Sequence, residues 1–186
     1  MFIDSHAHID GPEYEADRSE VIQRARDAGV RAILNVGTGD PHGRDLERAV
    51  NLAETNGDIY AAVGTHPHDA RLFDDQAEQR IRAWATENER VIAWGEIGLD
   101  YHYDNSPRDV QRTVFRRQLR LAKECELPVI IHTREADHDT IEILRAEYCD
   151  SVSGGIMHCF GGSLELAQAA IELGFLISFA GNITFK

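Results

Sequence analysis

Short apolar runs alternate with longer amphipathic stretches along this chain of 186 residues, and the alternation constrains the fold more than any other feature. The apolar runs are rich in Val, Ile and aromatic residues and are bounded by turn residues, which is typical of buried parallel strands. We predict seven such strands, over residues 2–5, 32–36, 60–64, 91–95, 129–132, 156–158 and 175–179.

The stretches between these strands have the spacing of amphipathic helices. In the first of them, Val21, Ile22 and Ala25 recur on one helical face, and Gly29 follows as a C-terminal cap. In the last, Ser163 is suited to cap the N-terminus. We predict six helices, over residues 18–28, 46–54, 77–86, 108–125, 139–147 and 164–173.

Regular alternation of strands and helices indicates parallel strands joined by right-handed crossovers, either in an open doubly wound sheet or in a closed barrel. A doubly wound dinucleotide-binding sheet is expected to carry G-x-G-x-x-G after its first strand. Here SHAHID follows the first strand, and VGTGD after the second lacks the third glycine. We therefore predict an α/β fold of the TIM-type (β/α)8 barrel class, with about seven strands present in this chain.

No long linker, low-complexity tract or internal repeat interrupts the chain, so we expect residues 1–186 to form a single domain. A barrel of this type usually takes about 250 residues, and the sequence stops at GNITFK soon after the seventh predicted strand. We therefore expect the final helix–strand–helix portion to be missing, through truncation rather than because a partner closes the sheet. An open sheet edge then predicts low solubility or self-association.

The composition of the chain disfavours several classes of function. The net charge of −13 argues against a surface that wraps nucleic acid, so a polyanionic substrate would need local arginines or bound cations. The three cysteines lack C-x-x-C spacing, which disfavours a zinc ribbon or a disulfide framework. We find no secretory signal and no run of the roughly 20 apolar residues that span a bilayer. We expect a cytoplasmic protein without a membrane segment or an obligate protein partner.

Histidines and one glutamate gather where the predicted strands end. Five of the seven strands lead directly into such a residue, and the carboxyl ends of parallel strands meet at one edge, where functional side chains collect. Taken singly, each is as easily a polar loop residue bonded to backbone or water. Together they predict a metal centre open to water. The residues at these strand ends are His6, His8, His66, His68, Glu96, His132 and His158.

Three of these residues suggest how the cations would be held. His6 and His8 are two residues apart, so in an extended strand their rings point to the same side. Glu96 offers two oxygens and is suited to bridge two cations, which in such pairs lie about 3.5–4 Å apart.

Five segments together resemble the motifs of the TatD-like metal-dependent deoxyribonucleases, a family of amidohydrolase-type barrels: FIDSHAHID, VGTHPHD, GEIGLDYHY, PVIIHTRE and MHCFGG. The resemblance runs in order through essentially the whole chain. It implies that His6 and His8 bind one divalent metal, that Glu96 bridges two, and that His132 and His158 bind the second. It also implies an acidic ligand in a T-D-x-P-like motif after an eighth strand. This sequence lacks that motif, so we expect the first metal to be bound more weakly.

The resemblance further implies phosphodiester hydrolysis, as 3′-to-5′ removal of nucleotides from DNA by a metal-activated water. The complete barrel would hold two divalent cations, Mg²⁺ first, with Mn²⁺ or Zn²⁺ as alternatives. We assign no catalytic group beyond the metal-bound water. His66 is a candidate for contacting the scissile phosphate or moving a proton, with ordering of its loop as the alternative. Arg134 is a candidate for binding a phosphate, with a salt bridge to Glu135 or another nearby acid as the alternative.

Other features admit two interpretations. The arginine-rich run over residues 108–120 is better explained as a solvated outer helix than as a DNA-binding face. Tyr101 and Tyr103 either stack on bases or pack within a loop. Two competing functions stay open: another amidohydrolase-type enzyme that splits amides or esters, which a metal-bridging Lys in place of Glu96 would favour, and a metal-binding remnant with little activity.

Overall fold

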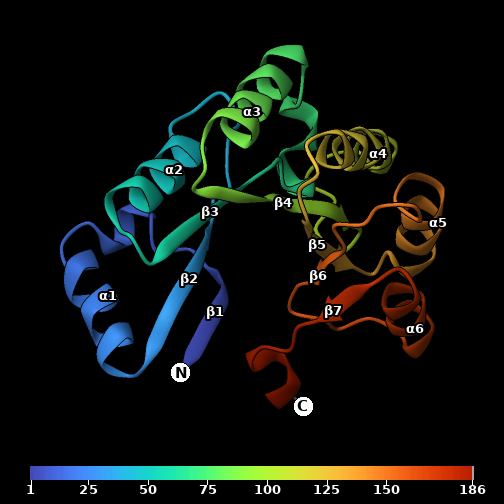
Figure 1. Cartoon of the computed structure of the whole chain (residues 1–186). Helices are drawn as coiled ribbons and strands as arrows, with labels where there is room; N and C mark the ends of the chain where they lie inside the picture. Colours follow the sequence, from blue (N-terminus) through green and yellow to red (C-terminus); the bar gives the residue numbers. More distant parts are fainter. Residues whose placement is uncertain (186) are drawn as a thin grey trace.

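The computed structural model describes residues 1–185. Seven parallel strands form one sheet in the order β1-β2-β3-β4-β5-β6-β7, and the α-helices lie on its outer side (Figure 1). The strands are β1 (Phe2–Ala7), β2 (Val30–Val36), β3 (Ile59–Val63), β4 (Val91–Asp100), β5 (Val129–Arg134), β6 (Gly155–Met157) and β7 (Phe175–Ile177). The helices are α1 (Arg18–Asp27), α2 (Asp45–Thr55), α3 (Asp75–Glu87), α4 (Arg108–Glu124), α5 (Asp137–Glu147) and α6 (Leu164–Glu172), with short 3₁₀ turns η1 (Pro12–Tyr14), η2 (Pro67–Leu72) and η3 (Gly181–Thr184).

The strand order identifies the barrel class. Every strand pairs in parallel with the next one in sequence, whereas a doubly wound sheet reverses its order at a switch point. The sheet curls so that β1 and β7 come to the same side of the molecule, near the two termini (Figure 1). Within residues 1–185, β1 and β7 are each paired along one edge only. The predicted TIM-type α/β fold is confirmed as a curled half-barrel of seven strands.

All seven predicted strands and six predicted helices are present, and their ends differ from the prediction by a few residues. The largest difference is in β4, which we expected to end at Gly95 and which continues to Asp100. The extension forms because β5 pairs with it over its whole length, with Gly98 opposite His132 and Asp100 opposite Arg134.

An irregularity in β4 decides which side chains face into the curl. Trp94, Ile97 and Leu99 all pack in the hydrophobic core between the sheet and the helices. A step of three residues from Trp94 to Ile97 breaks the alternation of a strand, and the β4–β5 register shifts at the same place. The extra residue acts as a β-bulge, which re-aims the side chains that follow it. Glu96 and Asp100 therefore share the opposite, inner face.

Apolar residues cover both faces of the sheet. The outer core, between sheet and helices, contains fully buried side chains such as Trp94, Leu119 and Ile131. Complete burial of a Leu or Ile side chain contributes ~1.5–3 kcal/mol. A separate small cluster lies on the inner face and comprises Val36, Ala62, Ala93 and Ile130.

Helix α4 carries the arginine-rich run, and its basic side chains are engaged by acids of the neighbouring helices. Arg116 lies 2.7 Å from Glu142 of α5, and Arg120 lies 2.7 Å from Glu147. Arg117 pairs with Asp75 of α3. The expectation of a solvated outer helix is thus confirmed, because these guanidinium groups already have partners.

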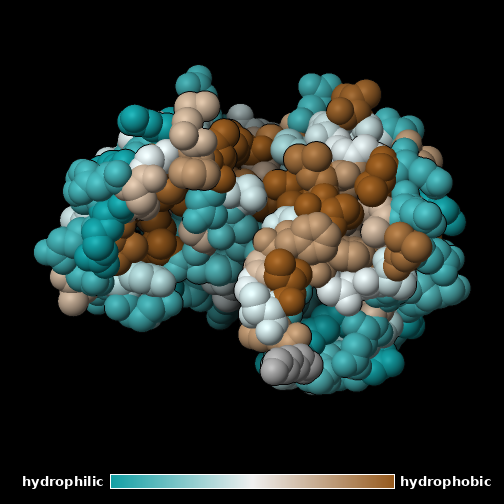
Figure 2. Space-filling view, turned by 90° about the horizontal axis from the view of Figure 1, so that it is seen from below, coloured by the Kyte–Doolittle hydropathy of each residue, from teal (hydrophilic) through white to brown (hydrophobic). Residues whose placement is uncertain are grey.

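Exposed apolar side chains collect near the two end strands. Figure 2 looks at the molecule from below, the side on which the two termini lie in Figure 1, and shows brown apolar residues among teal hydrophilic ones. The large exposed apolar side chains on β1 and β7 and in the segments next to them in the sequence are Met1, Phe2, Ile3, Leu176, Phe179, Ile183 and Phe185. None of the helices within residues 1–185 has the length and apolar character that a bilayer crossing requires.

Candidate metal centre

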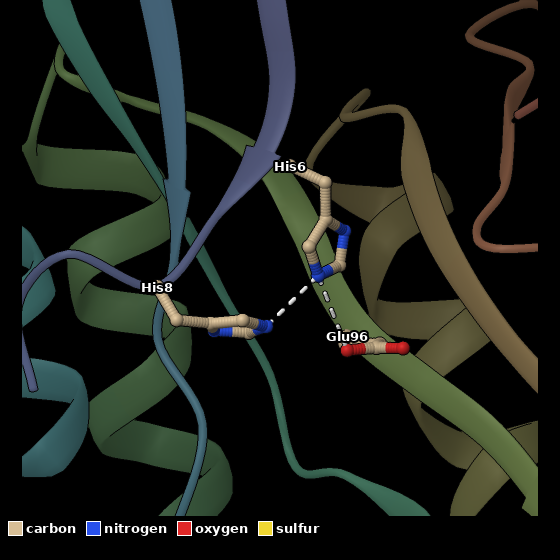
Figure 3. A group of neighbouring side chains, drawn as sticks. All are labelled: His6, His8 and Glu96. Carbon is tan, nitrogen blue, oxygen red and sulfur yellow. Dashed lines mark hydrogen bonds and ion pairs between the residues drawn. The ribbon is translucent and has the colours of Figure 1, made fainter. Parts of the chain in front are cut away.

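His6 and His8 converge on one carboxylate. His6 lies near the end of β1 and His8 just after it, and their Nε2 atoms are 3.0 Å apart. His6 Nε2 is also 3.5 Å from Oε2 of Glu96, which reaches the same point from β4 (Figure 3). Two ring nitrogens and a carboxylate oxygen this close together form a donor set suited to a divalent cation.

The tautomer of His8 is fixed by the backbone of β2. Its Nδ1–H donates to the carbonyl oxygen of Val36 at 2.8 Å, because a carbonyl can only accept, and this leaves the lone pair on Nε2. The segment after His8 is held by Asn35, a fully buried side chain. Asn35 accepts from the backbone N–H of Ile9 at 2.7 Å and donates to Asp10 at 2.8 Å.

The second oxygen of Glu96 faces β5. Oε1 lies 3.2 Å from Nδ1 of His132, so this one carboxylate stands between the imidazoles of β1 and the imidazole of β5. Glu96 is only 4% exposed. Burial alone would raise its pKa, but hydrogen bonds from His132 and His6 hold the pKa of Glu96 well below its usual range. Burial would likewise lower the pKa of His132, whereas the carboxylates of Glu96 and Asp100 raise it above the ordinary value.

His158 lies against His6. The two rings stack with centroids 3.3 Å apart and planes 11° from parallel. Burial and the neighbouring His6 lower the pKa of His158 to about 4, so the ring is neutral at pH 7, as a metal ligand must be. In the part of the chain that the structure describes, the groups of three converging ligand atoms at this edge are His6–His8–Glu96 and His66–Glu96–His132, and neither includes His158.

His66 contributes a second neutral ring. Burial lowers its pKa to about 3. Its Nδ1 accepts the backbone N–H of His68 at 3.2 Å, so the proton of the neutral ring must be on Nε2. A protonated nitrogen donates hydrogen bonds and has no lone pair for a metal, which favours contact with an anion over metal ligation.

Asp100 belongs to the centre and was not among the residues selected from the sequence. Its Oδ2 lies 2.9 Å from Nε2 of His132 and 3.0 Å from Nε2 of His68. Burial would raise its pKa, but hydrogen bonds from Tyr103 N–H and the two imidazoles lower the pKa to about 2. Asp100 follows Glu96 by four positions, so a strand extended to residue 100 would have placed both carboxylates on one face.

A pocket of about 450 Å³ adjoins the cluster on the side of β5 and β6, lined by His132, His158 and Arg134 among others. The Arg134 guanidinium stacks over the ring of Tyr103 at 4.9 Å from its centroid. Glu135 pairs instead with His102 at 2.7 Å, so the salt bridge that we considered between Arg134 and Glu135 is not formed. Arg134 therefore presents its charge beside the cluster with no carboxylate partner recorded within residues 1–185.

Comparison with known proteins places this geometry in a family. The family described as TatD related DNase matches residues 3–186. The chain belongs to this family. An uncharacterized metal-dependent hydrolase, YabD of Bacillus subtilis, is 46% identical over all of this chain and 71% of its own length. A 3′-5′ ssDNA/RNA exonuclease, TatD of a Pantoea species, is 35% identical over 96% of this chain and 67% of its own length.

The fold agrees with that of a TatD homologue. The crystal structure of YjjV from Escherichia coli superposes with a TM-score of 0.89 at 34% sequence identity, and the match covers 99% of this chain and 70% of that one. The TatD resemblance that the five sequence segments suggested is therefore confirmed.

Proposed function

We propose that this TatD-family chain is a divalent-metal-dependent hydrolase of phosphodiester bonds that removes nucleotides 3′-to-5′ from DNA. The observation that carries the proposal is the placement of Glu96, whose Oε2 faces His6 and whose Oε1 faces His132. A carboxylate that offers one oxygen to each of two imidazole groups is well placed to bridge a pair of cations. We assign the metal ligands as His6, His8, Glu96, His132 and His158.

Unsatisfied atoms support a fit between these residues and cations. Nδ1 of His158 is buried and has no hydrogen-bond partner within residues 1–185, which a cation beside the ring would explain. Nδ1 of His6 is also buried and unpartnered there, but it is on the other side of the ring from the Nε2 that faces Glu96. The 3.0 Å approach of two Nε2 atoms, one of which has its lone pair fixed toward the other, is also explained if both face a cation. When bound, divalent cations supply Lewis acidity at the phosphate and favour the ionisation of a water molecule.

The protein's own groups would position the substrate. We propose that Nε2–H of His66 donates a hydrogen bond to an oxygen of the scissile phosphate, and that Arg134 binds a phosphate with its planar fork of donors. These positive and neutral donors matter in a chain of net charge −13, because the surface as a whole repels a polyanion. The TatD relative named as an ssDNA/RNA exonuclease supports a single-stranded nucleic acid as the substrate.

The two halves of the centre should differ in affinity. Glu96 and His132 lie together on β4 and β5 in a fully paired part of the sheet. His6 lies on β1 and His8 directly after it, and within residues 1–185 β1 is paired along one edge only. We propose that the His6–His8 half holds its cation more weakly than the Glu96–His132 half.

The test is digestion of single-stranded DNA labelled at its 3′ or 5′ end, with Mg²⁺ or Mn²⁺ and with EDTA as the blank. We expect shortening from the 3′ end, and Glu96→Gln should lower the rate by at least about 100-fold, since even residues behind the ligands lose 10- to 100-fold.

Glu142→Gln is the matched control, because Glu142 belongs to an exposed His138–Asp139–Glu142 group that also has ligand-like spacing. Undiminished activity in Glu96→Gln, or equal losses in both variants, would refute the assignment of the centre. If the wild type cleaved a carboxylic ester but not DNA, the proposed substrate class would be refuted.

A further inference from the structure

Asp100 is a buried carboxylate whose oxygens are fully occupied by donors. It has no exposed surface. Oδ1 accepts the backbone N–H groups of His102 at 3.0 Å and Tyr103 at 2.9 Å. Oδ2 accepts from Nε2 of His132 at 2.9 Å and from Nε2 of His68 at 3.0 Å. A carboxylate has about four lone-pair sites, so these four contacts leave none that is free to bind a cation.

The contact to His132 decides which ring nitrogen can bind a cation. Because the Asp100 carboxylate only accepts, Nε2 of His132 must carry a hydrogen, and the lone pair of the neutral ring is then on Nδ1. Nδ1 is the atom that lies 3.2 Å from Oε1 of Glu96. The Glu96 carboxylate also only accepts, so a doubly protonated ring donates to both carboxylates. The neutral ring keeps its hydrogen on Nε2, whose contact with Asp100 at 2.9 Å is shorter than the 3.2 Å contact of Nδ1 with Glu96, and Nδ1 is then free for a cation.

The contact to His68 connects Asp100 with the loop after β3. The backbone N–H of His68 donates to Nδ1 of His66 at 3.2 Å, so the orientation of His66 depends on where residue 68 is held. Asp100 thus joins, through one oxygen, the imidazole of β5 and the loop that presents His66. Both rings also lie close to each other, with the His66 and His132 centroids 4.5 Å apart.

We propose that Asp100 is a positioning residue that fixes the Nε2–H tautomer and the ring orientation of His132, so that Nδ1 faces the cation. Through His68, Asp100 also holds the loop that carries His66 in place beside His132. The inference rests on the proposed function only in assigning a cation to His132. Carboxylates behind a ligating histidine typically change metal affinity by 10- to 100-fold.

The variant Asp100→Asn keeps the shape of the side chain and changes its hydrogen-bond pattern. The amide oxygen can still accept the two backbone N–H groups, but the amide nitrogen donates toward Nε2 of His132, which must then become the acceptor. We expect nitrogen NMR of the cation-free protein, at a pH where His132 is neutral, to show Nε2–H in the wild type and Nδ1–H in the variant. Titration calorimetry with Mn²⁺ should show a 10- to 100-fold weaker site in Asp100→Asn.

Asp58→Asn is the matched control, since Asp58 is a partly buried carboxylate that pairs with Arg26 far from the centre. It should leave both the His132 tautomer and Mn²⁺ affinity unchanged. An Nδ1–H tautomer in the wild type would overturn the inference without any variant, including the case in which Asp100→Asn does not fold. Equal Mn²⁺ affinity in wild type and Asp100→Asn would also overturn it. Absence of Mn²⁺ binding in the wild type would instead refute the proposed function, while the tautomer measurement still decides the role of Asp100.

Discussion

Gly98 is the position on β4 where we expect a side chain to be least tolerated. It pairs with His132 of β5 and has a backbone φ of +144°, a region that L-residues rarely adopt. A Cβ at this position would lie 1.9 Å from the carbonyl oxygen of His132, whereas real Cβ contacts essentially never fall below 3.0 Å. The variant Gly98→Ala must therefore separate the two strands at the residue that carries a proposed ligand.

The expected loss follows from two contributions. Forcing a side chain into the positive-φ region costs on the order of 1–3 kcal/mol. Overpacking against a fixed backbone atom costs another ~1–3 kcal/mol. A combined loss of roughly 2–6 kcal/mol is a large part of the 5–15 kcal/mol by which domains are typically stable. Because the strain falls on His132, Mn²⁺ binding should weaken as well.

Urea unfolding of wild type and Gly98→Ala measures this loss directly. Gly57→Ala is the control, because no heavy atom lies within 4 Å of a Cβ built there, and we expect it to stay within about 0.5 kcal/mol of the wild type. Unfolding of Gly98→Ala at the same urea concentration as Gly57→Ala would show that β4 and β5 do not approach so closely at Gly98.

Three further predictions concern pH, cations and substrate. In the cation-free protein the pKa values of His66 and His158 are about 3 and about 4, against an ordinary value of 6.5. Between pH 4 and 6.5 the unfolded state therefore binds more protons than the folded state. The contribution of His66 and His158 to the free energy of unfolding should be complete above about pH 6.5 and decline on acidification through that window. The pKa of His132 is raised, so its contribution should be complete below pH 6.5 and lost above it. Urea midpoints across pH 4–9 check both slopes, and a flat profile would contradict them. Adding Mn²⁺ at 100 times its Kd should raise the free energy of unfolding by about 2.7 kcal/mol, reversibly with EDTA, whereas no change in the melting temperature would show that the folded state binds no cation. Arg134→Gln should raise KM for single-stranded DNA roughly tenfold, as for a lost charge-assisted hydrogen bond, while Arg120→Gln on the ion-paired face of α4 should not; equal KM values for the two variants would remove Arg134 from the substrate site.

Much of the fold could be predicted from the sequence because its signals are local. Apolar runs and helical spacing located all seven strands and six helices, and the lack of a dinucleotide-binding glycine pattern favoured the barrel class that the strand order confirms. The end of β4 could not be predicted this way. The extension through GEIGLD depends on pairing with β5 and on a bulge between Trp94 and Ile97, which are relations between strands.

Most residues of the candidate site could be predicted from the sequence, but the hydrogen bonds between them could not. Histidines at strand ends indicated His6, His8 and His132, and the structure brings these rings around Glu96. The role of Asp100 was missed because its contact with His132 depends on the register of β4 against β5 and on the bulge that turns it inward. The choice of tautomer at each ring likewise depends on neighbours that are far away in sequence.

Glu96 is proposed to stand between two cation sites, and diffraction from crystals grown with Mn²⁺ would show both sites. Anomalous scattering locates Mn²⁺ independently of the protein model. We predict a strong peak beside Glu96 and His132, and a weaker one beside Glu96, His6 and His8. Peaks confined to the exposed His138–Asp139–Glu142 group, or an empty cluster at saturating Mn²⁺, would refute the bridging role of Glu96.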